Sequence, residues 1–248
     1  MKISVCMATH NGSQYVEKQI NSILTQLSVN DELIIVDDCS CDHTVDIIQG
    51  FEDHRICIIQ NYSNIGVINN FEKAILNAQG DIIFLSDQDD IWMPNKIQEV
   101  TKIFTQQRNV TLVTSNIGVI DEDDNLISNS KLVGDFIPGF IPNLFRPRFR
   151  GCTLAFRREM LNYFLPFPKD IPMHDMWIGL VNEIYGQTFY IDKPLIKYRR
   201  HSNNVTSDRH AAIIKILKWR YSLFKNLAMV IFKKTLVLRY LVWFDRGA

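Results

Sequence analysis

An alternation of apolar strands and amphipathic helices constrains this 248-residue chain more than any other feature. Each predicted strand is an unbroken run of apolar residues, which is typical of strands that are buried on both faces. The helices between them repeat apolar side chains at helical spacing. The predicted strands are 2–8, 32–36, 55–60 and 81–85, and the helices are 14–27, 42–51 and 67–79. This order predicts an α/β fold with a mostly parallel sheet that is flanked by helices on both faces.

The second half of the chain is predicted to add elements to the same domain. Residues 132–150 are rich in Pro, Gly, Phe and Arg and are expected to be a mobile loop region. Residues 197–208 are expected to be a polar loop. The other predictions are a helix from about 95 to 107, a strand at 110–119 with a hairpin through 121–127, a strand and helix at 153–164, a helix at 174–185 and a strand at 188–192.

Charge divides the chain into an acidic body and a basic tail. Residues 211–248 contain eight Lys and Arg and one Asp, a net charge of +7, which leaves −7 for residues 1–210. We expect one domain over 1–208 and a basic amphipathic helical tail over 209–248. Such a tail either lies on an anionic membrane surface or packs on the domain with its cations outside. Lys233 and Lys234 interrupt the apolar run, which argues against a membrane-spanning helix.

Cysteine usage indicates a reducing compartment. The five cysteines are an odd number, and no secretory signal with a cleavage site precedes them. We therefore expect a cytoplasmic protein. The segment Cys39–His43 has the wrong spacing for a zinc knuckle and lacks a second pair of ligands.

Polar loops follow the first four predicted strands, at the edge where open parallel sheets bind ligands. These loops carry Thr9, His10, Asn11, Asp37, Asp38, Asn64, Gly66, Asp87, Asp89 and Asp90. The glycine-rich phosphate loops of dinucleotide-binding folds and of P-loop enzymes are both missing from the sequence. A nucleotide diphosphate at this edge would instead need a divalent cation held by carboxylates.

An Asp-x-Asp pair is a weak signal when it stands alone. The chain has two copies, Asp87-x-Asp89 and Asp121-x-Asp123. The first directly follows a fully apolar strand, whereas the second begins a run of acids. We therefore assign the first copy to the metal and interpret the second as a solvated hairpin turn.

Several segments in order resemble the family 2 glycosyltransferases of the GT-A fold, over about residues 1–205. The segment Ile3–Gly12 resembles the family's opening, Ile34–Ser40 its second motif, Asn64–Gly66 its Asn-x-Gly, and Leu85–Trp92 its metal motif. Two further segments, 173–177 and 198–205, resemble the rhamnosyltransferase-like branch.

The resemblance implies a role for each matching residue. The nucleotide-binding residues would be Thr9, Asn11, Asp38, Asn64, Gly66 and Asp87. Asp89 would bind Mn²⁺ or Mg²⁺, with His201 completing the metal site. Asp175 would be the catalytic base, although His174 stands where the family often has Glu. Trp177 would face the acceptor sugar, and Gly151 and Cys152 would lie near the donor sugar.

Several of these assignments have a structural alternative. Asp37 and Asp38 could cap the following helix. Trp177 lies at helical spacing from Leu180 and Val181 and could be part of the core, while His201 could be a surface loop residue.

The chemistry of these residue types suits glycosyl transfer. A carboxylate base can take the proton of an acceptor hydroxyl, and a divalent ion can offset the charge on the leaving diphosphate. One base and one metal imply inversion at the anomeric carbon. The resemblance predicts transfer of rhamnose or a similar sugar from a dTDP or UDP donor to a bacterial cell-surface polysaccharide or lipid-linked glycan, at the inner face of the membrane.

Other functions remain as alternatives. A sugar-phosphate nucleotidyltransferase would need a basic, glycine-rich loop after the first strand, which residues 9–13 do not provide. A non-catalytic nucleotide-sugar-binding or membrane-associated scaffold would be favoured by a missing base. Nucleic-acid binding is disfavoured, because the basic residues gather in one hydrophobic tail without a recognition motif.

Overall fold

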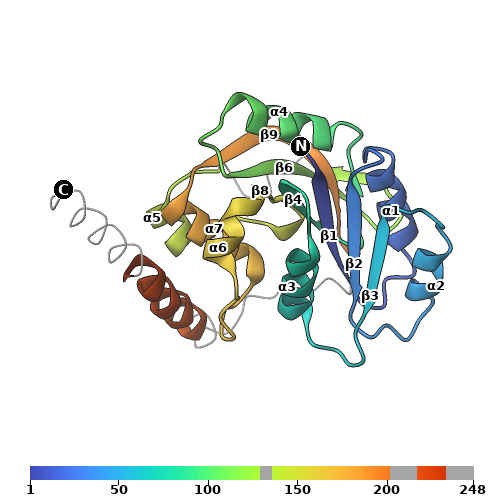
Figure 1. Cartoon of the computed structure of the whole chain (residues 1–248), viewed down its shortest axis with the longest axis horizontal. Helices are drawn as coiled ribbons and strands as arrows, with labels where there is room; N and C mark the ends of the chain where they lie inside the picture. The colour runs from blue at the N-terminus through green and yellow to red at the C-terminus, as the bar shows by residue number, and fades with distance from the viewer. Residues whose placement is uncertain (129–135, 202–216, 233–248) are drawn as a thin grey trace, which may run out of the picture.

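The computed structural model describes residues 1–128, 136–201 and 217–232. Within these ranges a nine-stranded sheet has the order β3-β2-β1-β4-β8-β6-β9-β5, with β7 paired to β6. Figure 1 shows the sheet curled between two layers of helices. The strands are β1 (Ile3–Thr9), β2 (Glu32–Asp37), β3 (Ile56–Gln60), β4 (Ile82–Asp87), β5 (Ile91–Trp92), β6 (Leu112–Ile120), β7 (Leu126–Ser128), β8 (Ala155–Arg157) and β9 (Thr188–Arg199).

The first four long strands pair in parallel, as the apolar runs predicted. The later strands form a mixed sheet. β8 is antiparallel to both β4 and β6, whereas β9 is parallel to β6. A parallel half is thereby joined through β8 to a mixed half.

Helices cover both faces of the sheet. They are α1 (Val16–Leu24), α2 (Thr44–Gln49), α3 (Val67–Asn77), α4 (Lys96–Gln106), α5 (Phe140–Phe145), α6 (Leu161–Phe164) and α7 (His174–Tyr185). Alternate β1 side chains serve opposite cores: Val5 packs with α1 and α4, and Cys6 packs with α3 and α7. This two-sided burial is the physical reason for the continuous apolar strands.

Three features of the second half differ in extent from the prediction. α5 lies within the segment predicted as a loop region, of which residues 132–135 are outside the described residues. β9 runs to Arg199, seven residues further than predicted, because it pairs in parallel with β6. The predicted polar loop therefore starts only after Arg199, and residues 202–208 lie outside the described residues.

The described part of the tail, residues 217–232, is helical and packs on the domain. Leu223 and Leu227 are buried in the core beside α7. Asn226 Nδ2 donates a hydrogen bond of 2.8 Å to Asp170, and the Tyr185 hydroxyl donates one of 2.9 Å to the carbonyl of Val230. Within the described ranges we find no helix that is both long and apolar enough to cross a membrane.

Candidate active site

The site lies at the carboxyl ends of β1, β2 and β4. The end of β1 meets the end of β2 through the Thr9 hydroxyl, which donates to Asp37 Oδ1 at 3.0 Å. The His10 imidazole lies 2.9 Å from the carbonyl of Asp38. The Thr9 side chain is buried and holds the ends of β1 and β2 together, whereas Asn11 is exposed.

Asp38 shapes the loop that follows β3. Its carboxylate accepts hydrogen bonds from the backbone N–H groups of Ile65 and Gly66, at 2.8 and 2.9 Å, and from Asn61 Nδ2 at 2.9 Å. Asp38 is buried, and Gly66 adopts a positive φ of 84° that favours glycine. In this arrangement Asp38 holds the predicted Asn-x-Gly loop in place, and exposed Asn64 stands at its rim.

Gln88 links the metal motif to the end of β1. Its Oε1 accepts from the His10 backbone N–H at 2.9 Å, and its Nε2 donates to the His10 carbonyl at 3.1 Å. A Cβ on Gly12 would overlap the Gln88 side chain. The glycine of the opening motif therefore leaves room for the Gln88 amide between the two loops.

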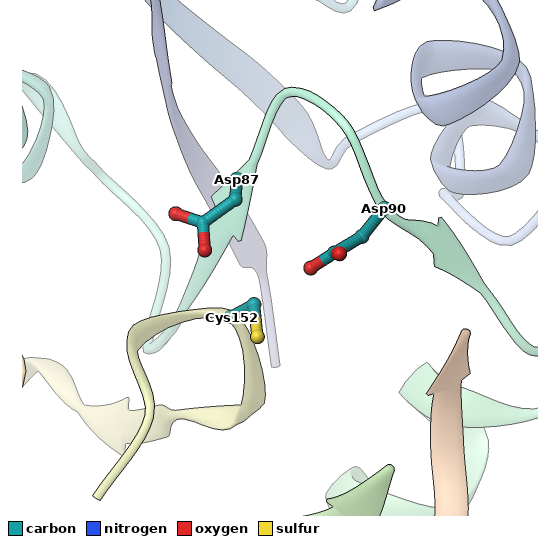
Figure 2. Close-up of side chains that lie close together, drawn as sticks. All are labelled: Asp87, Asp90 and Cys152. Carbon is teal, nitrogen blue, oxygen red and sulfur yellow. The ribbon is translucent and has the colours of Figure 1, made fainter. Parts of the chain in front are cut away.

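The metal motif carries Asp87, Asp89 and Asp90. Asp87 and Asp90 lie close to Cys152, whereas Asp89 lies beside His201. Figure 2 shows Asp87 at the end of β4, Asp90 beyond the loop, and Cys152 on the neighbouring short helix η1 (Gly151–Thr153). One ligand atom from each of these three residues lies within 4.8 Å of the others. Asp90 is fully buried, its Oδ1 accepts from the Arg199 backbone N–H at 3.0 Å, and its Oδ2 is without a partner.

Burial dominates the electrostatics of this acidic centre. It raises the pKa of Asp87 to about 7, with a further contribution from the neighbouring charges of Asp89 and Asp175. It likewise holds the pKa of Asp90 well above the usual range. These are groups whose charged form a bound cation would stabilise.

Asp89 and His201, the predicted metal ligands, lie side by side. His201 Nε2 is 2.8 Å from Asp89 Oδ2. The two residues are 112 positions apart in the sequence, and both side chains are more than four-fifths buried. Carboxylate oxygen with one imidazole nitrogen is a donor set that suits Mn²⁺ better than Mg²⁺. Cys152 is a poor ligand for either ion, because Mn²⁺ and Mg²⁺ prefer oxygen ligands to a thiolate.

Lys96 is a buried cation that sequence analysis did not single out. Its Nζ donates to the Cys152 carbonyl at 2.7 Å and lies 4.1 Å from the centre of the Trp92 ring. Burial lowers its pKa to about 7. Lys96 therefore links α4 to the turn at 151–153, and its charge lies close to Asp87 and Asp90. A helical lysine just after an acidic loop was the signal available in the sequence.

Arg199 is the second group that was missed. Its guanidinium is fully buried and donates to the carbonyl of Asp89 at 2.8 Å and to that of Asp121 at 2.9 Å. It also pairs with Asp124 Oδ1 at 2.5 Å. The acidic turn at 121–124 is therefore bonded to a buried arginine, whereas the sequence indicated a solvated turn. The hairpin of β6 and β7 around it is as predicted.

Asp175 lies in the first turn of α7, beside the turn at 151–153. The backbone N–H of Gly151 donates to its Oδ2 at 3.1 Å, and the N–H of Met176 donates to Oδ1 at 2.7 Å. Burial raises its pKa to about 6 in spite of these bonds. A carboxylate with this pKa is ionised near neutral pH and still basic enough to accept a proton.

Two neighbours of Asp175 point elsewhere. His174 is buried and stacks on Phe71, with ring centres 4.1 Å apart, and burial lowers its pKa to about 3. Trp177 is 3% exposed and donates from Nε1 to the Phe164 carbonyl at 2.8 Å. Its side chain is part of the core, which is the alternative that the sequence left open.

The comparisons with known proteins identify the family. The family model described as "Glycosyl transferase family 2" matches residues 4–164. This chain belongs to that family. The match spans β1 to α6 and contains the polar loops that follow β1, β2, β3 and β4.

Relatives share a quarter to a third of their residues with the chain. It is 30% identical over 215 residues to the dTDP-rhamnosyl transferase RfbG of Shigella flexneri, covering 80% of this chain and 72% of RfbG. It is 26% identical to WfgD of Escherichia coli, a glucosyltransferase that uses UDP-Glc, covering 84% and 80%. An uncharacterized glycosyltransferase of Nostoc is 28% identical, and the match covers 82% of this chain and 66% of that protein.

Solved structures confirm the fold. The structure of Staphylococcus aureus TarS in complex with UDP-GlcNAc matches with a TM-score of 0.72 at 17% identity, covering 93% of this chain and 66% of that one. The mannosyltransferase PcManGT of Pyrobaculum calidifontis, in complex with GDP-Man and Mn²⁺, matches with a TM-score of 0.59 at 18% identity, covering 77% and 54%. At these identities the likeness concerns the GT-A fold alone.

Proposed function

We propose that the chain is an inverting, metal-dependent glycosyltransferase that moves a sugar from a nucleotide diphosphate to a glycan acceptor. The observation that carries the proposal is the convergence of three groups on one sheet edge. These groups are the paired Asp89 and His201, the half-buried acid Asp87, and Asp175 beside the turn at 151–153.

Each group has a defined task in the proposal. Asp175 takes the proton of the acceptor hydroxyl, since its raised pKa keeps it basic. Asp89 and His201 hold Mn²⁺ or Mg²⁺, and when bound the ion supplies charge stabilisation for the leaving diphosphate. The orphaned Asp90 Oδ2 adds a further oxygen to the anionic surroundings that favour a cation.

The remaining residues bind the nucleotide and the sugars. Asn11 and Asn64 are exposed at the edge and offer amide groups to a base and ribose, while Thr9 and Asp38 act from below by fixing the two loops. Gly66 lets its loop approach closely. Gly151 and Cys152 form the turn on which the donor sugar rests. A dTDP- or UDP-linked rhamnose or similar sugar follows from the likeness to RfbG and WfgD, and the product would be a bacterial surface polysaccharide or lipid-linked glycan.

A donor panel tests this function directly. The protein is incubated with Mn²⁺ and each of dTDP-rhamnose, UDP-glucose, UDP-GlcNAc and GDP-mannose, and release of the nucleotide diphosphate is measured. We expect release from a pyrimidine donor, accelerated by an acceptor glycoside. Binding of nucleotide without turnover on any donor and acceptor would favour the scaffold alternative.

We further propose that 1–208 form the catalytic unit and that the tail, 209–248, contacts the inner face of the cytoplasmic membrane. The tail helix buries one face, yet on its other face Tyr221 and Phe224 are 71% and 65% exposed. Arg220 bonds to the carbonyl of Phe145 at 2.7 Å, which places α5 and its exposed Phe145 next to this face. Exposed Lys218 and Lys225 add positive charge.

Liposome sedimentation of the full chain tests the membrane contact. Binding to vesicles that contain anionic lipid should fall strongly in the double variant Tyr221→Ser with Phe224→Ser. The control is Leu76→Ser on α3, which removes a comparably exposed apolar side chain elsewhere. Equal binding of both variants would exclude this face as the membrane contact.

A further inference from the structure

A polar cleft lies beside the turn that holds Asp175. Its lining includes Ser115, Asn116, Phe136, Arg148, Arg150 and Tyr190, and its volume of about 290 Å³ includes the solvent at its open mouth. The enclosed part has room for about one water-sized group, so the cleft can take up one polar group of a ligand whose remaining part lies at the mouth. No acidic side chain belongs to the described residues that line it.

Two buried polar atoms of the cleft are without a partner. Ser115 is 6% exposed, and its hydroxyl makes no hydrogen bond. The Nε of Arg150 is likewise buried and unpaired. Buried polar groups in native proteins are nearly always hydrogen-bonded, so an orphaned pair in one cleft points to a ligand that supplies the missing partners.

The walls of the cleft combine a flat apolar surface with positive charge. Phe136 stacks on Tyr190 with ring centres 5.2 Å apart and nearly parallel planes. Arg148 and Arg150 supply two guanidinium groups, which match carboxylate and phosphate oxygens in a bidentate manner. This pairing of an aromatic surface with arginines suits a sugar that bears an anionic group.

The cleft is connected to the catalytic base through the backbone. Arg150 directly precedes Gly151, whose N–H bonds to Asp175 at 3.1 Å. The Thr153 hydroxyl, also in the lining, lies 2.7 Å from that of Thr114 and fixes the turn against β6. The charge of Arg150 also acts on Asp175 and lowers its pKa, so the cleft and the base share this arginine as a neighbour.

We propose that this cleft is the acceptor subsite and that it selects an acceptor carrying a carboxylate or a phosphate close to the attacked hydroxyl. Arg150 and Ser115 bind the anionic group, and the Phe136–Tyr190 pair supports the sugar ring. The inference rests on the proposed glycosyl transfer and names its acceptor class. The anion can be a uronic acid carboxylate or the phosphate of a lipid-linked sugar, and the test below separates the two.

Binding to the UDP-saturated protein is the test, because it does not depend on turnover. With UDP and Mn²⁺ filling the nucleotide edge, ligand-observed NMR measures the Kd of methyl glucuronide, glucose 1-phosphate and methyl glucoside. We expect at least one anionic ligand to bind about tenfold or more tightly than the neutral glycoside, the equivalent of one charge-assisted hydrogen bond. The tighter of the two anionic ligands identifies carboxylate or phosphate.

Variants assign the preference to the cleft. Arg150→Gln and Ser115→Ala should each reduce the preference for the anionic ligand, with the larger loss in Arg150→Gln, and Arg150→Lys should retain part of it. The matched control is Arg108→Gln, which removes an exposed arginine just after α4. A UDP-dependent rise in melting temperature shows that each variant is folded. If Arg150→Gln is unfolded, Ser115→Ala decides.

Two results would overturn the proposal. One is equal affinity for the charged and neutral glycosides, and the other is a preference that survives the cleft variants. Either result, obtained while UDP still binds, would leave the proposed transferase function standing. Failure to bind UDP at all would instead contradict the proposed function itself.

Discussion

Arg199 Nε donates to the carbonyl of Asp89 at 2.8 Å, so a buried guanidinium supports the backbone of the proposed metal ligand from beneath. The same side chain reaches the acidic turn after β6 and pairs with Asp124. Because the next residue but one is His201, the end of β9 fixes both proposed metal ligands.

Replacing Arg199 by Met should destabilise the fold and weaken metal binding together. The change leaves the carbonyls of Asp89 and Asp121 without this donor and leaves Asp124 with Lys18 as its remaining cation, and breaking a buried ion pair costs about 3–5 kcal/mol. Urea unfolding measures the loss, and Arg108→Met is the exposed control. A loss below about 1 kcal/mol would show that Arg199 is not a structural support.

Asp175→Asn should separate chemistry from binding. The amide keeps the size of the side chain but cannot accept the acceptor proton, so turnover should fall by about 10²–10⁴-fold. The Kd for the nucleotide should stay within about twofold, since Asp175 lies outside the nucleotide loops. Steady-state kinetics and calorimetry measure the two quantities, with Asp46→Asn on α2 as an exposed control. Unchanged turnover would remove Asp175 from the mechanism.

The rate should depend on pH in the direction that the raised pKa of Asp175 sets. The base acts as a carboxylate, and burial raises its pKa to about 6. Activity should therefore be constant above this pH and fall about tenfold per unit below it. The profile of kcat/KM between pH 4.5 and 8.5 checks this expectation. A rate that stays constant down to pH 4.5 is incompatible with a base of raised pKa.

Gly12→Ala should weaken nucleotide binding through Gln88. The added Cβ overlaps the Gln88 side chain and forces it away from the His10 backbone, to which it makes two hydrogen bonds. We expect the Kd for UDP to rise by about 5–30-fold, the range of one or two kcal/mol. The single variant Gln88→Ala removes the same two hydrogen bonds without any overlap and should weaken UDP binding to a similar extent. If Gln88→Ala binds UDP as tightly as the unaltered protein, loss of the Gln88 contacts is not the cause.

The order of strands and helices was predictable because each element carries its own periodic signal. Unbroken apolar runs predicted β1 to β4, and the family resemblance identified the polar loops that follow them. The roles of Arg199 and Lys96 were not predictable in the same way. Arg199 and its acceptor Asp89 are 110 positions apart, and Lys96 and Cys152 are 56 apart. Only the folded sheet brings them together.

The role of a residue is ambiguous in the sequence when its type and spacing suit both a structural and a functional position. Asp38 follows a strand and could have contacted a nucleotide directly, yet its carboxylate is fully engaged with the loop after β3. Trp177 has the spacing of a core residue and is one. α5 was missed because the Pro- and Gly-rich composition of its segment concealed a single short helix.

The most direct test of the central claim is thermal unfolding with UDP, dTDP, GDP and ADP, each with Mn²⁺, with Mg²⁺ or with chelator. A ligand at 100 times its Kd adds about 2.7 kcal/mol to the free energy of unfolding, which is a clear shift in melting temperature. We predict a shift with a pyrimidine diphosphate that requires the metal and disappears in Asp89→Ala. If no nucleotide shifts the unfolding under any metal condition, the account of this edge as a nucleotide-sugar site is contradicted.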